Sequence, residues 1–360
     1  MRLIATVLVV ALVGCAGSDD PETNDRPEEA AADGYSIETL VDGLEGPTQI
    51  AWHPDGRLLV AVLGEGGEGS DSGQVLAVES VGPVATDGGP PAGPEVLVSG
   101  LDTPTGLAVI DDTIWIMERT RLVSAPLAGG AVTVVRDDLP SNGRSNGSLT
   151  VTSEGRLLYN TSGRQEGTRA ADGSGVLWSL DPLDPASEDQ PVMTGMKHAY
   201  ATAEDGQGGL LVTEIGDGTY DGERPPDEVV VIPQLQERDV ADGGWPRCIG
   251  DREPVAENDG SPEWCARAVP SLALFEPGAT PTGVAPAPWD PNRAVVALWV
   301  TGALVEIPTT RPAGDAPVAS TPIATGLDGP QHLLADGDRL LLSVHGEGEV
   351  LTLNRSAPGD

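Results

Sequence analysis

The sequence is poor in cationic and in aromatic side chains. Aromatic residues make up 3% of its 360 residues, and 20 lysine and arginine side chains stand against 56 aspartate and glutamate side chains. The resulting net charge of −36 argues against nucleic acid as a partner, because phosphate binding needs a basic surface. It argues equally against electrostatic docking on anionic lipid. Such a charge favours solubility in an exposed setting.

Several motifs of catalysis and metal binding are missing. The sequence has no His/Cys cluster with zinc spacing, no glycine-rich phosphate loop in a strand–helix setting, and no Gly-x-Ser-x-Gly elbow. It also has no long helical pattern. Its valine and leucine runs are short and bounded by Gly, Pro, Asp or Asn, which is typical of strands joined by turns. The sequence therefore predicts an all-β fold.

The first residues have the form of an export signal. The apolar run 3–13 follows Met1-Arg2 and is too short to span a bilayer, which takes about 20 residues. It ends at Gly14-Cys15, which resembles the bacterial lipobox. We expect a signal peptide over residues 1–14 and an extracytoplasmic protein anchored to a bacterial membrane through lipidated Cys15. The alternative is an ordinary secretory signal with a chance cysteine.

The residues after the signal divide into a tether and a folded domain. Residues 15–34 are rich in Asp, Glu, Pro and Ala and cannot bury enough apolar surface to offset ordering, so they are predicted to be disordered. The folded domain is expected over residues 35–360. Its two cysteines, Cys248 and Cys265, form an even pair in an exported chain and predict a disulfide.

One phrase recurs along the folded part. Each copy opens with Gly-Leu or a similar pair, continues through Pro or Thr into an apolar strand, and adds a turn and further strands. The copies begin near Asp42, Gly100, Leu139, Gly195, Gly278 and Gly326. Six copies of roughly 40 to 60 residues fit the blades of a six-bladed β-propeller. The alternative is a pair of β-sandwiches with similar turns.

The residues just before the innermost strand of each blade crowd one mouth of a propeller's channel. In this chain they form a mixed polar ring: Thr48, Gln49, Thr105, residues 144–146, Lys197, His198, Thr282, Gln331 and His332. The channel mouth is therefore the predicted site. Lys197 is the only lysine of the chain, which suggests that an ammonium is needed there, with chance retention as the alternative. For His198, the alternative to a role in the site is a purely structural role.

An acidic loop after the apolar stretch 210–212 is one substitution away from a calcium-loop pattern. Oxygen-bearing residues alternate in it, and a glutamate falls at the twelfth place, so hard ligands can wrap a cation. The candidate Ca²⁺ ligands are Gly216, Asp217, Thr219, Asp221, Asp227 and Glu228. In a chain this acidic, chance spacing is the alternative.

Several stretches carry a resemblance to a known family. They are residues 148–165, Thr213-Glu-Ile-Gly with Asp227-Glu-Val-Val-Val-Ile, Gly243-Gly-Trp-Pro, and Cys248-Ile-Gly-Asp with Cys265 and Pro281-Thr-Gly-Val. Over residues 41–353 the chain resembles the quinoprotein glucose/sorbosone dehydrogenases, in their sorbosone-type branch. The resemblance implies a six-bladed propeller that oxidises a sugar or polyol with pyrroloquinoline quinone (PQQ) and Ca²⁺.

The resemblance also implies roles for single residues. The cofactor would be bound by Lys197, Tyr200, Glu214, Thr282, Thr301 and His332. Arg144 stands where the family has its catalytic histidine, and a guanidinium, which is always charged, cannot accept a hydroxyl proton. Lys197 matches a family arginine, and Thr301 matches a cationic residue that would grip the PQQ carboxylates.

Two functions stay open at this point. One is a PQQ- and Ca²⁺-dependent dehydrogenase in which Arg144 and Lys197 neutralise anions and His198 acts as base. The other is a lipid-anchored propeller without catalytic activity that binds a carbohydrate, a peptide, an anionic ligand or a partner protein at its channel mouth. Fold alone does not decide between them, because propellers host unrelated activities.

Overall fold

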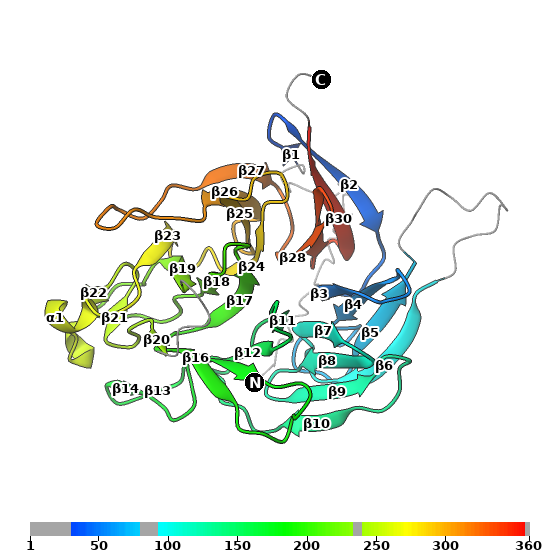
Figure 1. Ribbon diagram of the computed structural model, residues 1–360, viewed down its shortest axis with the longest axis horizontal. Coiled ribbons are helices and arrows are strands. Elements are labelled where there is room, and N and C mark those ends of the chain that lie inside the picture. The colour runs from blue at the N-terminus through cyan, green and yellow to red at the C-terminus, as the bar shows by residue number, and fades with distance from the viewer. Residues whose placement is uncertain (1–29, 80–92, 233–239, 357–360) are drawn as a thin grey trace, which may run out of the picture.

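The computed structural model describes residues 30–79, 93–232 and 240–356. These residues form six sheets of four or five strands, set like blades around a central axis (Figure 1). The predicted six-bladed β-propeller is thus confirmed, with one blade for each copy of the recurring phrase. The expected signal peptide and lipidated Cys15 lie outside the described residues, as does most of the expected tether.

Each blade begins with its innermost strand and runs outward, and the first strands of neighbouring blades contact one another in a closed ring. The first blade contains β3 (Pro47–Trp52), β4 (Leu58–Val62), β5 (Gly73–Val78) and β6 (Glu95–Leu101). The second contains β7 (Gly106–Ile110), β8 (Thr113–Met117), β9 (Leu122–Pro126) and β10 (Thr133–Arg136). The third contains β11 (Thr150–Val151), β12 (Leu157–Thr161), β15 (Val176–Leu180), β16 (Gln190–Thr194) and, in parallel at its edge, β20 (Ala241–Asp242).

The remaining blades follow the same plan. The fourth contains β17 (Ala199–Glu204), β18 (Leu210–Glu214), β19 (Asp227–Ile232) and β23 (Ser271–Phe275). The fifth contains β24 (Pro281–Pro286), β25 (Arg293–Leu298), β26 (Ala303–Pro308), β27 (Thr321–Thr325) and β1 (Ala30–Ala31). The sixth contains β28 (Pro330–Asp336), β29 (Arg339–Val344), β30 (Glu349–Arg355) and β2 (Tyr35–Val41).

The last blade takes its outer strand from the start of the chain. Strand β2 pairs antiparallel with β30, from Tyr35 opposite Arg355 to Val41 opposite Val350. Strand β1 pairs with the edge of the fifth blade through β27. Pairing therefore begins at Ala30 and not at residue 35, because β27 offers an open strand edge to the two alanines.

The core consists of apolar layers between neighbouring blades. Six buried clusters lie between blades, and each joins side chains from two adjacent sheets. A second strand such as β4 is buried along its whole length because it contacts a neighbouring blade on each face. This explains why the apolar runs are continuous and do not alternate with polar residues.

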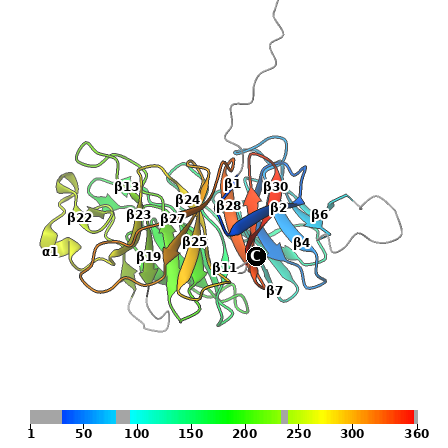
Figure 2. The ribbon, with the colours of Figure 1, turned by 90° about the horizontal axis from the view of Figure 1, so that it is seen from above.

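A short insert extends the third and fourth blades at the rim of the disc (Figures 1 and 2). It contains β21 (Cys248–Ile249), β22 (Glu253–Pro254), the 3-10 helix η1 (Ala256–Asn258) and α1 (Pro262–Cys265); a separate hairpin, β13 (Gln165–Glu166) and β14 (Arg169–Ala170), lies beside the third blade. The predicted disulfide between Cys248 and Cys265 is confirmed, with Cα atoms 5.8 Å apart.

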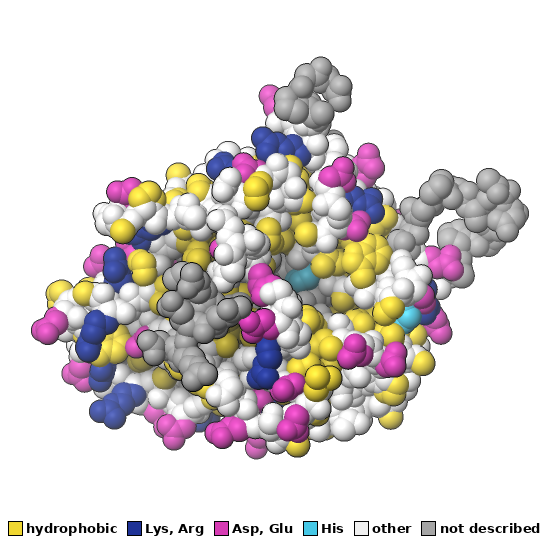
Figure 3. Space-filling view, viewed as in Figure 1, with side chains coloured by type: hydrophobic (Ala, Val, Ile, Leu, Met, Phe, Trp, Pro, Cys, Tyr) yellow, Lys and Arg dark blue, Asp and Glu magenta, His cyan; other side chains and the backbone are white. Residues whose placement is uncertain are grey.

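The distribution of charged side chains on the surface agrees with the solubility expected from the net charge. Acidic side chains are scattered over the face seen in Figure 3, with single Lys or Arg side chains among them. Within the described part of the chain, neither helix has the length and apolar character needed to cross a bilayer.

A repeated hydroxyl contact joins the blades at their inner ends. Thr48 Oγ1 donates to the carbonyl of Pro104 at 2.7 Å, and Thr282 Oγ1 donates to that of Pro330 at 2.8 Å. Thr105 makes the corresponding contact from the second blade to the third. These threonines are buried. The Pro-Thr pairs in the repeated phrase therefore encode contacts between blades.

Replacing such a threonine should weaken the ring. Thr282→Val keeps the shape of the side chain but removes the bond to Pro330, and we expect a loss of about 1–3 kcal/mol in the free energy of unfolding. Urea unfolding measures it. Thr321→Val, at an exposed position on β27, is the control and should change stability by less than about 0.5 kcal/mol. Equal midpoints for the two variants would show that the contact is not stabilising.

Candidate functional site

A cavity of about 740 Å³ opens at the channel mouth, where the inner strands begin. We call it the mouth cavity. Every blade contributes to its lining, including Thr48, Thr105, Ser145, Tyr200, Thr282 and Gln331. The structure therefore places a cavity where the repeats predicted the site.

Some of the predicted polar ring holds the channel together. Gln49 Oε1 accepts from the backbone N–H groups of Leu107 and Leu149, both at 2.8 Å, and its Nε2 donates to the Leu149 carbonyl at 2.7 Å. Gln331 Nε2 donates to the Tyr200 hydroxyl, from the sixth blade to the fourth. The side-chain amides of Gln49 and Gln331 therefore form hydrogen bonds between blades, so fewer polar groups of the predicted ring remain for a ligand.

His198 is a group left for a ligand. It lies directly before β17, lines the mouth cavity and is 2% exposed, with Tyr200 edge-on at 5.2 Å. Neither of its ring nitrogens has a hydrogen-bond partner among the described residues. Burial and the nearby Lys197 lower the pKa of His198 to about 3, so the imidazole is neutral at physiological pH. An unpaired buried polar group is costly, so a ligand that bonds to His198 gains affinity.

The ammonium of Lys197 is turned away from the mouth cavity. Its Nζ donates to the Gly163 carbonyl at 2.8 Å and lies 5.3 Å from the centre of the Trp245 ring. The two residues are consecutive in the connection to β17, and of the two only His198 lines the mouth cavity. Lys197 therefore stabilises the contact between the third blade and the insert, which corrects the expectation of an ammonium at the mouth.

Arg144 lies at the rim of the cavity. Its guanidinium is largely exposed, and Nε donates to Asp217 Oδ2 at 3.1 Å. This pair joins the third blade to the loop after β18. The charge of Arg144 is thus already balanced, and the side chain cannot serve as a base.

The residues expected to bind the cofactor do not come together. Tyr200 and Thr282 line the mouth cavity, and both are hydrogen-bonded to other blades. Thr301 is exposed and His332 is partly buried, and neither belongs to the lining. The neighbour of His332, Gln331, lines the cavity in its place, at an irregularity in the pairing of β28 with β29. Glu214 and Lys197 line a separate small cavity beneath the mouth.

The predicted calcium loop also comes apart. Both Asp221 oxygens accept backbone N–H groups at the start of η1, from Ala256 at 2.6 Å and from Glu257 at 2.9 Å. Thr219 is exposed. Asp221 is therefore hydrogen-bonded to the backbone of the insert and does not point to a common centre with the other predicted calcium ligands.

The other three acidic ligands also point to separate partners. Asp227 accepts from the backbone N–H groups of Gly216 and Thr280, both at 2.7 Å. Asp217 pairs with Arg144, and Glu228 is buried in the small cavity. Within residues 30–79, 93–232 and 240–356, no three His, Cys, Asp or Glu side chains are placed to hold a metal ion.

Glu214 and Glu228 form a buried carboxyl pair across β18 and β19. Glu214 accepts from the backbone N–H of Lys197, and Glu228 accepts from the Ser271 hydroxyl. Burial raises the pKa of Glu214 to about 7 and raises that of Glu228 well above its usual value. The pair therefore keeps a proton near neutral pH.

Reasoning from the repeats missed many of the lining residues. Four with functional side chains are Glu68, Arg224, Trp299 and His345. Three of them follow β4, β25 and β29, and Arg224 lies in the hairpin between β18 and β19. In an antiparallel blade the second strand ends where the first begins, so these ends reach the same mouth. The sequence therefore carried a signal for three of them, which is their position just after the second apolar run of a repeat.

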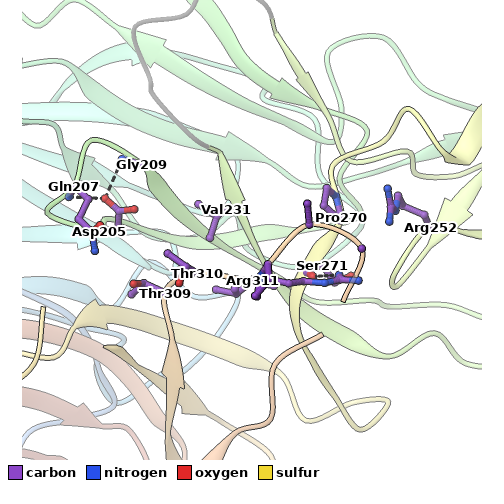
Figure 4. A pocket seen from close by; sticks show the side chains of 14 residues that line it. Asp205, Gln207, Gly209, Val231, Arg252, Pro270, Ser271, Thr309, Thr310 and Arg311 are labelled. Carbon is purple, nitrogen blue, oxygen red and sulfur yellow. Dashed lines mark hydrogen bonds between the residues drawn. The ribbon is translucent and has the colours of Figure 1, made fainter. Parts of the chain in front are cut away.

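A second cavity of about 540 Å³ lies between the fourth and fifth blades. Figure 4 shows Asp205 and Gln207 at one end, Arg252 at the other and Arg311 between them. Arg311 is bound by Asp251 at 2.8 and 2.9 Å, and Asp205 accepts from two backbone N–H groups. Most of its charged groups are thus satisfied within the chain, so the mouth cavity is the stronger candidate.

Comparisons with known proteins show the fold. No family model matches the chain, and no curated protein matches its sequence. Solved structures match over nearly the whole chain. The calcium structure of a Trichoderma reesei carbohydrate-active enzyme of family AA12 is 18% identical, with a TM-score of 0.74, over 92% of this chain and 98% of that chain.

Two further similar structures are of PQQ proteins. The holo PQQ domain of pyranose dehydrogenase from Coprinopsis cinerea is 17% identical, with a TM-score of 0.71, over 92% of this chain and 98% of that chain. The PQQ-bound aldose sugar dehydrogenase from Streptomyces coelicolor is 18% identical, with a TM-score of 0.64, over 90% and 99%. The chain thus has the fold of soluble PQQ-dependent sugar dehydrogenases, as the sequence predicted, and the sorbosone-type branch stays a prediction.

The carboxyl pair should make stability depend on pH. Because the folded chain holds the proton of Glu214 to about pH 7, against about 4.5 for the ordinary group, stability falls as pH rises through this range. Glu228→Gln removes the repulsion between the two carboxyl groups. Between pH 5 and pH 8 this variant should lose less free energy of unfolding than the wild type, by on the order of 1–3 kcal/mol.

Urea unfolding of both proteins at the two pH values measures the difference. Glu253→Gln, at an exposed position on β22, is the control and should follow the wild type. The idea of a shared proton fails if Glu228→Gln and the wild type lose the same stability.

Proposed function

We propose that the mouth cavity binds a polyhydroxylated ligand of the sugar class, and that binding is the function of the protein. The observation that carries this proposal is His198, which lines the cavity and whose two ring nitrogens are buried without hydrogen-bond partners among the described residues. A neutral imidazole donates through one ring nitrogen and accepts through the other, so it can bond to two separate hydroxyl groups of a polyhydroxylated ligand.

The rest of the lining suits the same class of ligand. Carboxylates accept hydrogen bonds from hydroxyl groups, and the cavity is lined by Glu68 and Asp217. Trp299 and His345 lie with ring centres 5.0 Å apart and offer an aromatic surface for the C–H face of a sugar ring. The structural neighbours include a carbohydrate-active enzyme, a pyranose dehydrogenase and an aldose sugar dehydrogenase, whose names all refer to sugars.

The lining does not fit PQQ, which is a tricarboxylate. Five carboxylates line the cavity (Glu45, Glu65, Glu68, Asp217 and Asp227), against two guanidinium groups (Arg144 and Arg224). Arg144 is already paired with Asp217, and the ammonium of Lys197 is turned away. Placing like charges together in a site costs several kcal/mol. The residues present therefore oppose a polyanionic cofactor.

The second candidate is a quinoprotein-type dehydrogenase that oxidises a sugar or polyol with PQQ and Ca²⁺. The fold likeness over about nine-tenths of the chain favours it. A neutral His198 has the protonation state of a base, although a pKa of about 3 makes it a weak one. Reduction of a dye by the protein with PQQ, Ca²⁺ and a panel of sugars would establish this candidate in place of the first.

Calorimetric titration with sugars and sugar alcohols tests the proposed function. At least one ligand of the panel should bind, and His198→Ala should weaken it about tenfold through the loss of a hydrogen bond. His53→Ala is the control, because His53 forms a pair with Asp55 in the turn after β3, outside the lining, and should leave affinity unchanged. Absence of heat with every sugar would remove the proposal.

We also propose that the protein is held on the outside of a bacterial membrane by lipid on Cys15, which lies outside the described residues. The support is the lipobox-like end of the apolar run 3–13. Cys15→Ser should move the protein from the membrane fraction to the soluble fraction of cells, because the acyl chains supply the anchor. An unchanged distribution on a blot of the two fractions would contradict the anchor.

A further inference from the structure

We infer that the ligand of the mouth cavity carries a positive charge beside its hydroxyl groups, as an amino sugar does. This inference rests on the proposed function and names the class of ligand more closely. It follows from where the charges of the lining lie, from the partners they lack, and from the aromatic pair beside them.

Three carboxylates of the lining come from the first blade and are unbalanced. Glu45 precedes β3, and Glu65 and Glu68 follow β4. Within the described residues none of the three forms a salt bridge. The two guanidinium groups of the lining have other neighbours, since Arg144 pairs with Asp217 and Arg224 lies against Gly278 of the fifth blade. The first blade therefore gives the cavity a negative side.

Glu68 brings this charge into the mouth. It accepts a hydrogen bond from the Ser145 hydroxyl of the third blade at 3.4 Å, so it reaches across the opening. Its charge also acts on Tyr200 of the fourth blade and on His345 of the sixth, although burial is the largest cause of the shifted pKa of each. One carboxylate is thus close to groups from three other blades.

His198 is a second, independent observation that points to a ligand in the cavity. It is 2% exposed, and its two ring nitrogens have no hydrogen-bond partner among the described residues. It precedes the fourth blade, which is opposite the first in a ring of six. A ligand that bonds to both His198 and Glu68 needs a hydroxyl for the neutral ring and a donor for the carboxylate. An ammonium is the stronger donor to a carboxylate.

The aromatic pair lies next to the negative side. The ring of His345 lies against Gly46, where an added Cβ would come within 2.7 Å of Cε1, and Gly46 is the neighbour of Glu45. Trp299 lies beyond His345, with ring centres 5.0 Å apart. A cation beside an aromatic face is stabilised by about 0.5–1 kcal/mol at exposed sites. Carboxylate and aromatic surface thus favour the same charge on the ligand.

A bare metal ion does not account for this arrangement. The described residues contain no group of three acidic, histidine or cysteine side chains placed for a metal. An organic ammonium needs no such convergence, because one carboxylate and an aromatic face hold it while His198 bonds to a hydroxyl. Glucosamine combines these features and is the probe we would use.

Calorimetric titrations of the protein near pH 6, where the amine of glucosamine is charged, test the inference. Glucosamine should bind at least tenfold more tightly than glucose or N-acetylglucosamine, and added salt should reduce this preference because it screens the ion pair. Glu68→Gln should weaken glucosamine binding about fivefold to tenfold and leave glucose binding unchanged.

Glu166→Gln is the control, since Glu166 is exposed on β13 and pairs with Arg164 outside the mouth. It should bind both sugars as the wild type does. Equal affinities for glucosamine and glucose in the wild type would overturn the inference and leave the proposed function standing. If no sugar binds at all, the proposed function itself falls. Tighter binding of the anion gluconate would overturn the positive charge directly.

Discussion

The pairing of β2 with β30 is the contact on which the rest of the molecule depends. A propeller buries its apolar layers only if the last blade meets the first, and here the outer strand of the sixth blade comes from the other end of the chain. Closing the ring leaves each blade between two others, so that all six interblade layers are filled. It also brings the inner ends of all six blades to one point, and the mouth cavity is a product of that closure.

Polar residues at the mouth then divide into two groups. Thr48, Thr282 and Gln49 use their hydrogen bonds on neighbouring blades and hold the ring. His198 and Glu68 keep bonding capacity toward the cavity. The first group makes the cavity rigid, and the second gives it a chemical preference. Because rigid sites lose less entropy on binding, the interblade contacts would favour the proposed binding without touching a ligand.

Reasoning from the sequence predicted the architecture well because a repeat is a strong signal. The six phrase openings, the disulfide and the position of the mouth are all where they were expected. The prediction of the site failed in its details for a physical reason, which is that consecutive side chains point to different sides of the backbone and the repeat does not show which of them lines the cavity. Lys197 and His332 each stand one residue from a group that faces the cavity, and each points elsewhere. The calcium pattern failed because local backbone donors captured Asp221 and Asp227.

The central claim is that the acidic lining of the mouth cavity opposes the binding of a polyanionic quinone, although the chain has the fold of the quinoprotein sugar dehydrogenases. Calorimetric titration of the purified protein with PQQ in excess Ca²⁺ tests it most directly. The unbalanced carboxylates of the first blade and the paired Arg144 predict no measurable binding. Tight binding that depends on Ca²⁺ would contradict the account, because it would show that the mouth accepts the quinone despite its acidic lining.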